Sequence, residues 1–552
     1  DQGKPQALRI VDIDDGTAQR KNFVQDALLK MTKGDSVTVL FPLDSLQMRP
    51  PGVSADAKFL NCHISLVDIM KEEAYQSYVA DVREKESSVE YKSYDEVDDP
   101  GQYESVNIKG KLLIEPDSED NKRILIGFSH SDYFGPALQT VAEPYEDRVS
   151  NVAQATRHNP LTNSLSLDYS QDVSDEFYFQ LNTSLTDVEF TRIGALDTTN
   201  TTIDTHEAVF EPQLHYENDG INVVTGLYYY RAQEEQNSEL FSFGDVHYED
   251  ETDTLSAYAE GSFALSDKTS LSMGLRYEQE LRHRYGGAYS NGVTSDDFDH
   301  DENYSELLPK IGINWQQSEA VNWGAQISKG YNAGGAGWSL DGLSVVNYEY
   351  DEETSWTYEI YSRQQLLQGK LISTQNLFHS RYKDLQLAYS TTDDWDNDNS
   401  YSVTNVDKVN TWGFEQGLTA LLSDEFTLSG SIGLLNTEIV EFSNDTSLEG
   451  NDLAIAPSVT SSISLDWHKD NWTANLNLRY SGSYYTYPNN ASASETKSYV
   501  LANVGTTYKI GDAEWFARID NLLDEDAIIY QRSTSAVLLQ PRSFLVGVQY
   551  TL

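Results

Sequence analysis

Apolar and polar residues alternate one by one over long stretches of this chain, from about residue 100 to the C-terminus. Segments 271–278 (LSMGLRYE), 426–434 (FTLSGSIGL) and 472–480 (WTANLNLRY) each place apolar residues on one side of an extended strand and polar residues on the other. A period of two is typical of a β-strand with one apolar and one polar face. We therefore expect an all-β chain, and the 35 tyrosines support this because aromatic residues favour strands.

The segments between these strands are of two kinds that follow each other in turn. Short polar turns are predicted at 117–121, 172–174, 218–220, 267–268, 318–319, 368–369, 424–425, 468–470 and 511–512. Long polar segments are predicted as loops at 134–160, 233–253, 284–303 and 332–348. The strands between them often exceed ten residues, which is longer than the ~5–6 residues usual in soluble sheets. Long strands with short turns on one side and long loops on the other are typical of a transmembrane β-barrel.

A closed barrel also explains how a chain of this composition crosses a membrane. No apolar run approaches the ~18 residues of a membrane-spanning helix, whereas a closed ring of strands satisfies every backbone hydrogen bond within the lipid. The nine short turns and a further one at 83–86, between strands at 75–82 and 87–94, predict about 22 antiparallel strands. We expect a multi-pass β-barrel in the outer membrane of a Gram-negative cell.

The N-terminal part follows a different pattern. Strands are predicted at 7–13 and 37–41, and segment 17–31 carries apolar residues at helical spacing. We therefore divide the chain into a small α/β, plug-like segment at 1–73 and a barrel at 74–552.

The charge of the chain excludes one class of partner. Acidic residues number 88 against 38 basic ones, for a formal net charge of −50. Nucleic-acid binding needs clustered Lys and Arg, so no nucleic-acid partner is expected. The single cysteine, Cys62, permits no intramolecular disulfide, and we interpret it as a small buried apolar residue.

Segment 328–335 (SKGYNAGG) places a lysine among glycines, as nucleotide-binding loops do. A P-loop needs Gly-Lys-Ser/Thr ahead of a helix, but Lys329 precedes the glycines and its flanks read as strands. Alternation puts Trp323, Lys329 and Tyr331 on the outward face, and the strand from Trp323 to Tyr331 rises about 20 Å when tilted by ~40°. We expect Tyr331 in the outer aromatic girdle, Lys329 extending past it to the headgroups, and the glycines where the chain leaves the wall.

Two acidic segments match a calcium loop only in part. Asp394, Asp396 and Asp398 alternate as such a loop begins, but the twelfth position is Asn405 and the mid-loop glycine is missing. We interpret them, with the acidic segment 296–304, as solvated extracellular loops. Weak Ca²⁺ binding that bridges to lipopolysaccharide is the alternative, and no other metal or cofactor is expected. No nucleophile–base motif stands out, so no enzymatic activity is expected.

Aromatic residues on the side of the long loops are the candidate ligand contacts. They are Tyr331, Trp338, Trp395, Tyr484 and Tyr485. Packing within loops and a place in the membrane-interface girdle are the alternative roles for such side chains.

Several motifs, in one order along the chain, resemble those of the TonB-dependent outer-membrane receptors. They are 108–116 (IKGKLLIEP), 307–315 (LLPKIGINW) with 327–335 (ISKGYNAGG), the segment 350–387, 403–415 (VTNVDKVNTWGFE), 517–525 (ARIDNLLDE) and 541–552 (PRSFLVGVQYTL). Within 350–387 the residues that match the family's pattern are Glu353, Trp356, Tyr358, Glu359, Phe378, Tyr382 and Gln386. The resemblance covers roughly residues 103–552.

The resemblance implies a monomeric receptor that imports a scarce nutrient, above all an iron–siderophore complex. The partners it implies are that small ligand, a TonB-type energy-coupling protein, outer-membrane lipids and lipopolysaccharide. The chain departs from the family in lacking a clear Arg-Gly-Pro segment and coupling box; 35–41 (DSVTVLF) resembles the box faintly, and 63–69 (HISLVDI) resembles a last plug strand. The chain also ends in Leu552 where the family usually has Phe.

Two other classes remain open at this point. The short N-terminal part favours a passive, porin-like barrel or a degenerate receptor without a functional plug. A mean hydropathy of −0.52 favours a secreted soluble β-rich protein.

Overall fold

The structure is a computed structural model of the chain. It describes residues 36–42, 59–65, 103–115, 121–136, 140–149, 156–193, 199–239, 245–290, 293–341, 344–390, 392, 395, 401–533 and 535–550. These residues form strands and three 3-10 turns, Tyr145–Asp147 (η3), Thr446–Leu448 (η7) and Ser492–Ser494 (η8). Within the described ranges, no helix has the length and apolar character needed to cross a membrane.

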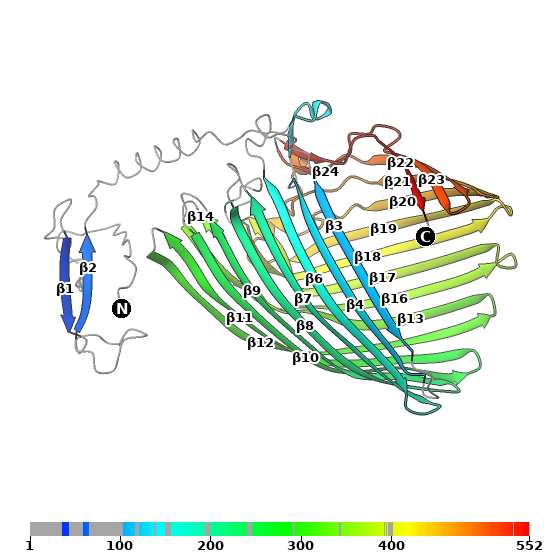
Figure 1. Cartoon of the computed structure of the whole chain (residues 1–552), viewed down its shortest axis with the longest axis horizontal. Coiled ribbons are helices and arrows are strands. Elements are labelled where there is room, and N and C mark those ends of the chain that lie inside the picture. The colour runs from blue at the N-terminus through cyan, green and yellow to red at the C-terminus, as the bar shows by residue number, and fades with distance from the viewer. Residues whose placement is uncertain are drawn as a thin grey trace. The chain divides into compact units, whose positions relative to one another are not determined.

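Nineteen of the described strands form one closed barrel (Figure 1). In chain order they are Glu104–Ile114 (β3), Arg123–Pro136 (β4), Arg157–Asp172 (β6), Phe177–Ile193 (β7), Thr199–Asn218 (β8), Ile221–Glu239 (β9), Asp245–Ser266 (β10), Thr269–Ser290 (β11), Val293–Ser318 (β12), Val321–Asn332 (β13), Glu353–Leu366 (β16), Leu371–Ser390 (β17), Tyr401–Leu421 (β18), Phe426–Glu441 (β19), Val459–Lys469 (β20), Trp472–Ser481 (β21), Tyr499–Ile510 (β22), Ala513–Asp520 (β23) and Ser543–Tyr550 (β26). Strands that follow each other in this series are neighbours, and β26 lies beside β3.

This ring confirms the predicted all-β barrel. The strands predicted at 75–82 and 87–94 fall outside the described residues, so the total of about 22 strands stays a prediction.

Smaller sheets accompany the barrel. Gly335–Asp341 (β14) and Ser344–Tyr350 (β15) form a hairpin, and Ile528–Gln531 (β24), Ser535–Leu538 (β25) and Val141–Ala142 (β5) form a three-stranded sheet in the order β24-β25-β5. Both sheets belong to the long connections, so these connections carry regular structure of their own.

Each of the nine predicted short turns lies between two consecutive barrel strands. The two-residue turns at 219–220 and 511–512 contain Gly220 and Gly511, with φ of 87° and 61°. Glycine reaches this left-handed region without a steric penalty, which is why it occurs in tight hairpin turns.

The long polar segments differ from the prediction. Segment 233–253 is divided between the end of β9 and the start of β10, and segment 284–303 between the end of β11 and the start of β12, so the loops predicted there are wrong in extent. A strand that continues into water has no need of an apolar face, and its polar residues therefore resemble a loop. Segment 332–348 contains β14 and most of β15.

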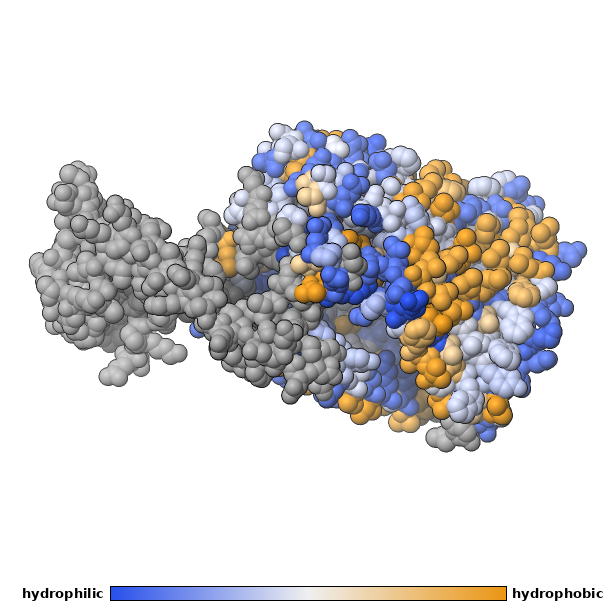
Figure 2. Space-filling view, turned by 90° about the horizontal axis from the view of Figure 1, so that it is seen from above, coloured by the Kyte–Doolittle hydropathy of each residue, from blue (hydrophilic) through white to orange (hydrophobic). Residues whose placement is uncertain are grey.

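One face of the barrel wall is apolar. On β11 the side chains of Met273, Leu275 and Tyr277 are exposed, whereas the intervening Arg276 and Glu278 are not. Figure 2 shows a broad apolar band across the barrel, with polar surface beside it. An exposed apolar belt on a closed barrel is the surface that faces lipid, so Arg276 and Glu278 face the inside.

Aromatic side chains border this outer belt. Near the short turns the exposed residues are Trp315, Trp323, Trp472, Tyr508 and Trp515, and farther from these turns they are Tyr277, Trp356, Tyr358, Trp412 and Tyr480. The first set is aligned across strands, since Trp315 lies opposite Trp323 and Trp472 opposite Tyr508. Two such rows are the aromatic girdles of the two membrane interfaces.

The N-terminal part contributes one two-stranded sheet, Ser36–Pro42 (β1) and Phe59–Ser65 (β2), which pair antiparallel. This confirms the strand predicted at 37–41. The helix predicted at 17–31 and the strand at 7–13 lie outside the described residues, so the plug-like nature of 1–73 stays a prediction.

A charge on the outer belt tests its contact with lipid. We expect Ile327→Arg to lower the free energy of unfolding in lipid vesicles by about 2–4 kcal/mol, because the guanidinium would lie near the bilayer midplane. The matched control is Gln326→Arg on the same strand, since Gln326 faces inward and already hydrogen-bonds Glu359. Equal losses in the two variants would contradict the assignment of faces.

Candidate functional site

The inner face of the wall is charged near the end of the barrel that carries the long connections, which we call the mouth. β11 begins at a short turn, so its later residues lie toward the mouth. Its charged inward residues are Arg276, Glu278, Glu280, Arg282 and Arg284. We call this set, with the side chains it contacts on neighbouring strands, the inner wall.

Arg276 lies in an aromatic and acidic surrounding. Its guanidinium stands 5.1 Å from the ring centre of Tyr228 and 5.8 Å from that of Tyr258, and its Nε donates to Glu278 at 2.7 Å. The Tyr258 hydroxyl donates to Glu211 at 2.7 Å. Stacking and ion pairing together fix the plane of the guanidinium.

Arg284 has the same kind of surrounding, a tyrosine ring and a carboxylate, nearer the mouth. Its guanidinium lies 4.5 Å from the ring centre of the fully buried Tyr248. Nη1 donates to Asp250 and Nη2 to Gln236, both at 3.2 Å, whereas the buried Nε has no hydrogen-bond partner. The donors of Arg284 are therefore only partly used.

Arg282 and Lys310 are paired in the same way. Arg282 Nε donates to Glu280 at 2.5 Å, and Lys310 Nζ donates to Glu260 at 2.7 Å. A guanidinium has five N–H donors in a fixed fork, so a pairing of this kind leaves donors for a further oxygen-rich group. The inner wall thus offers positioned hydrogen-bond donors whose charge is already balanced by carboxylates.

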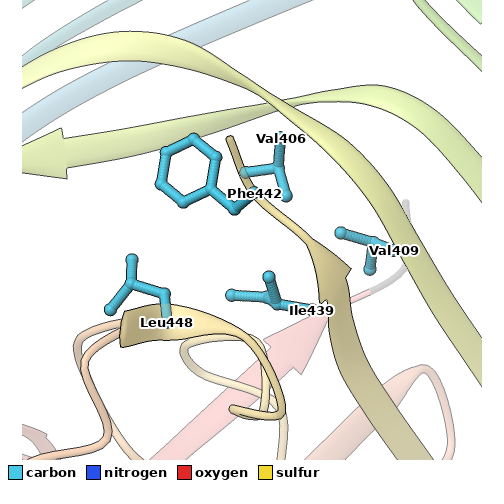
Figure 3. Close-up of a cluster of buried hydrophobic side chains, with 5 residues drawn as sticks. All are labelled: Val406, Val409, Ile439, Phe442 and Leu448. Carbon is cyan, nitrogen blue, oxygen red and sulfur yellow. The ribbon is translucent and has the colours of Figure 1, made fainter. Parts of the chain in front are cut away.

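The connections between β17 and β20 form a small apolar core at the mouth (Figure 3). Its buried members, Val406, Val409, Ile439, Phe442 and Leu448, come from β18, β19 and the segment after β19. Burial of this kind stabilises loops that would otherwise be mobile. We call it the loop core.

The predicted contact Trp395 packs against the loop core. Its ring lies 5.5 Å from Tyr389, 6.1 Å from Tyr401 and 6.2 Å from Tyr487, centre to centre. The Tyr401 hydroxyl also donates to the Trp395 carbonyl at 2.6 Å. Trp395 therefore joins the β17–β18 connection to the β21–β22 connection.

A capping carboxylate holds the segment after β19. Asp445 Oδ1 accepts from the backbone N–H of Ser447 at 3.0 Å and from its hydroxyl at 2.6 Å. These hydrogen bonds lower the pKa of Asp445, so the carboxylate stays ionised as it caps η7.

Tyr484 and Tyr485 lie in the β21–β22 connection. Tyr484 is buried, and its hydroxyl donates to the carbonyl of Ile529 in β24 at 2.7 Å. Burial raises the pKa of Tyr484 to about 12. Tyr485 is partly exposed, and its carbonyl accepts from Ile455 N–H at 2.8 Å. Tyr484 thus joins two loops.

The structure separates the remaining predicted contacts from this group. Trp338 lies on β14, opposite Asn347 of β15, and Tyr331 lies on β13. The Tyr331 hydroxyl is buried without a hydrogen-bond partner, so its place in an exposed outer girdle is wrong. Lys329 was expected to reach the headgroups, but it forms an ion pair with Glu306 and its side chain is only 18% exposed.

The weak calcium site is not tested. Asp394, Asp396 and Asp398 lie outside the described residues. Within the part that the structure does describe, no group of three His, Cys, Asp or Glu side chains is placed to hold a metal ion.

The inner wall was missed in the sequence, although a signal for it existed. The alternation on β11 already placed Arg276 and Glu278 opposite the apolar face. Continuing the same phase to Glu280, Arg282 and Arg284 gives five charged inward positions in succession. The strand expected from alternation ends at residue 278, and the loop predicted at 284–303 takes Arg284 out of it.

Comparisons with known proteins agree with this architecture. The family model described as "TonB dependent receptor-like, beta-barrel" matches residues 98–522. The ferric yersiniabactin uptake receptor FyuA from Yersinia pestis is similar, with 17% identity, a TM-score of 0.65, and coverage of 81% of this chain and 70% of that chain. The siderophore receptor PiuA from Acinetobacter baumannii has 14% identity, a TM-score of 0.67 and coverages of 83% and 75%. The unliganded ferric citrate transporter FecA has 15% identity, a TM-score of 0.62 and coverages of 81% and 70%.

The loop core should unfold separately from the barrel. We expect Phe442→Ala to destabilise the mouth by about 3–5 kcal/mol, because it removes a fully buried aromatic ring. Hydrogen exchange of the amides in 401–409 and 436–450 should accelerate while the short turns stay unchanged. Leu434→Ala, on the lipid-facing side of the same strand, is the control and should leave the loop core protected.

The buried Tyr484 should make the stability of the mouth loops depend on pH in the alkaline range. Because the pKa of folded Tyr484 lies above its ordinary value of 10, the folded loops hold its proton more tightly than unfolded ones. This stabilisation is complete below pH 10 and is lost as the pH rises to about 12. Limited proteolysis of the loops should accelerate over this range.

Tyr484→Phe should remove the alkaline pH dependence of loop stability. It should also lower the free energy of unfolding at pH 8 by about 1 kcal/mol, since the Ile529 carbonyl loses its donor. Tyr485→Phe is the control. A wild-type pH profile in Tyr484→Phe would exclude Tyr484 as the origin.

Proposed function

Since the chain belongs to the TonB-dependent receptor family of outer-membrane β-barrels, we propose that it imports an iron–siderophore complex across the outer membrane. The ligand would enter at the mouth, contact the inner wall and the aromatic loops, and pass through the lumen. Energy would come from a TonB-type protein that contacts the N-terminal segment. Residues 1–73 would be the plug, and the ligand would bias the release of part of it, an order–disorder switch.

The inner wall is the observation that carries this proposal. Ferric chelates are large and rich in oxygen acceptors, and the wall presents Arg276, Arg282 and Arg284 in fixed orientations beside tyrosines. Guanidinium groups that are held by stacking bind such acceptors with little loss of conformational entropy. The names of FyuA, PiuA and FecA indicate transport or uptake of siderophores and iron complexes by proteins of the same fold.

The remaining partners follow from the site of action. The outer belt would contact lipid, and the acidic loops, with Asp394, Asp396 and Asp398, would bind Ca²⁺ weakly and bridge to lipopolysaccharide. The barrel would act as a monomer without enzymatic activity.

Binding and conductance test the proposed function together. A ferric tris-catecholate, a ferric tris-hydroxamate or ferric citrate should quench the tryptophan fluorescence of the full chain in detergent. For one of the three chelates, the titration should give a dissociation constant below micromolar. The metal-free chelators are the controls. Arg284→Met should weaken that binding by about tenfold, since it removes a charge-assisted donor set.

The passive alternative predicts a different result. An open porin-like barrel would show a large constitutive conductance in planar bilayers and no saturable binding of any of the three chelates. That pair of results would refute the import function.

A further inference from the structure

Gly334 and Gly335, at the end of segment 328–335, mark the start of an inward-folded hairpin. The chain leaves β13 after Asn332 and enters β14 at Gly335. β14 and β15 pair without a break from Gly335 with Tyr350 to Asp341 with Ser344. β16 then begins at Glu353. This hairpin is therefore an insertion between two neighbouring strands of the wall.

The hairpin lies against inward-facing side chains. Tyr248 of β10 donates its hydroxyl to Asn347, and His300 Nδ1 lies 3.0 Å from Glu349 Oε1. Both Tyr248 and His300 are buried. β14 and β15 also contact β18, several strands farther around the ring. The hairpin is consequently packed on the inside of the mouth.

The glycines are required by how closely the backbone approaches the inner wall. A Cβ on Gly334 would lie 2.6 Å from the Tyr304 hydroxyl and 2.5 Å from the Tyr350 carbonyl, and a Cβ on Gly335 would lie 3.1 Å from Arg282 Nη1. No real Cβ fits at the first two distances. The backbone at the start of the hairpin therefore lies directly against Arg282 and Tyr304.

Two side chains outside the hairpin hold both of its ends. Gln386 Nε2 donates to the carbonyls of Ala333 at 2.7 Å and Asp351 at 3.1 Å, and Gln386 Oε1 accepts from Asn332 at 2.8 Å. Asn405 accepts from the Asp351 N–H at 2.7 Å and donates back to the Asp351 carbonyl at 2.8 Å.

Gln386 and Asn405 lie directly opposite each other on β17 and β18. Glu353, the first residue of β16, accepts from the Gln386 backbone N–H at 2.7 Å. Amide side chains that satisfy backbone groups on both sides of an insertion fix its angle to the wall. We call Gln386 and Asn405 the clamp.

We propose that the β14–β15 hairpin is a specificity gate over the inner wall, and that Gln386 and Asn405 are the positioning residues that keep it seated. Seated, the gate restricts access to Arg282 and Tyr304. A ligand that displaces the gate gains those donors, but its binding breaks part of the hydrogen bonding of the clamp. Only ligands with sufficient differential affinity for the open state therefore bind this part of the wall. This inference rests on the proposed function for its ligand, but the seated gate can be tested without one.

Cysteine labelling measures whether the gate is seated. In full-length Cys62→Ser protein, Tyr304→Cys should react slowly with fluorescein-5-maleimide. Adding Gln386→Ala and Asn405→Ala should raise the labelling rate by about tenfold or more, because several hydrogen bonds that oppose opening are lost together. Gln375→Ala with Gln416→Ala is the matched control, since these residues also pair on β17 and β18 and hydrogen-bond each other at 3.1 Å, but away from the hairpin.

A second variant and a folding check keep the result interpretable. Gly334→Val should accelerate labelling of Tyr304→Cys like the clamp variants, because a Cβ at this position would lie 2.5 Å from the Tyr350 backbone carbonyl. Each variant must still migrate faster on gels when unheated, as a folded barrel does. Labelling at the unmodified rate in both folded variants would overturn the proposal.

Ligand binding separates failure of the gate from failure of the import function. With a ferric tris-catecholate, loosening the clamp should change the dissociation constant by at least about threefold, as expected when the binding-competent fraction changes. An unchanged constant with accelerated labelling would overturn the gate's role in specificity. If no chelate binds any variant, the import function fails, whereas the seated hairpin still stands or falls by the labelling rates.

Discussion

The closed ring and the alternation of its strands depend on one physical constraint. A backbone N–H or C=O left unpaired in lipid costs several kcal/mol. Strands can meet it only as a ring, which here closes where β26 meets β3. The ring in turn imposes alternation, because each strand must place one residue in lipid and the next in the lumen. The aromatic rows and the balanced charges of the inner wall are consequences of that two-sided surrounding.

The inner wall carries arginines that face the lumen in a chain with a net charge of −50. Arg276, Arg282 and Arg284 are each paired with a carboxylate, and two of them also stack on tyrosine rings. This arrangement preserves orientation while cancelling charge. Recognition at such a wall depends on hydrogen-bond geometry more than on net attraction.

The barrel could be predicted from local sequence pattern. The side-chain pairs between residues distant in sequence could not. A period of two and short turns are visible within ten residues, so the described barrel strands and the nine short turns between them could be predicted. The pairing of Arg284 with Asp250, or of Gln386 with the backbone at Ala333, joins residues more than 30 positions apart. Lys329 shows the same limit, since alternation alone could not reveal Glu306 as its partner.

The length of the strands has a consequence for how the molecule comes apart. β18 has 21 residues, which rise about 50 Å at ~3.3 Å per residue and ~40° of tilt, whereas the apolar band takes about 25 Å. Each long strand is thus built for two solvents, with lipid stabilising one half and cross-strand polar contacts and the loop core stabilising the other. Replacing lipid by detergent perturbs only the first half, so extraction should leave the mouth folded and make unfolding a two-step process.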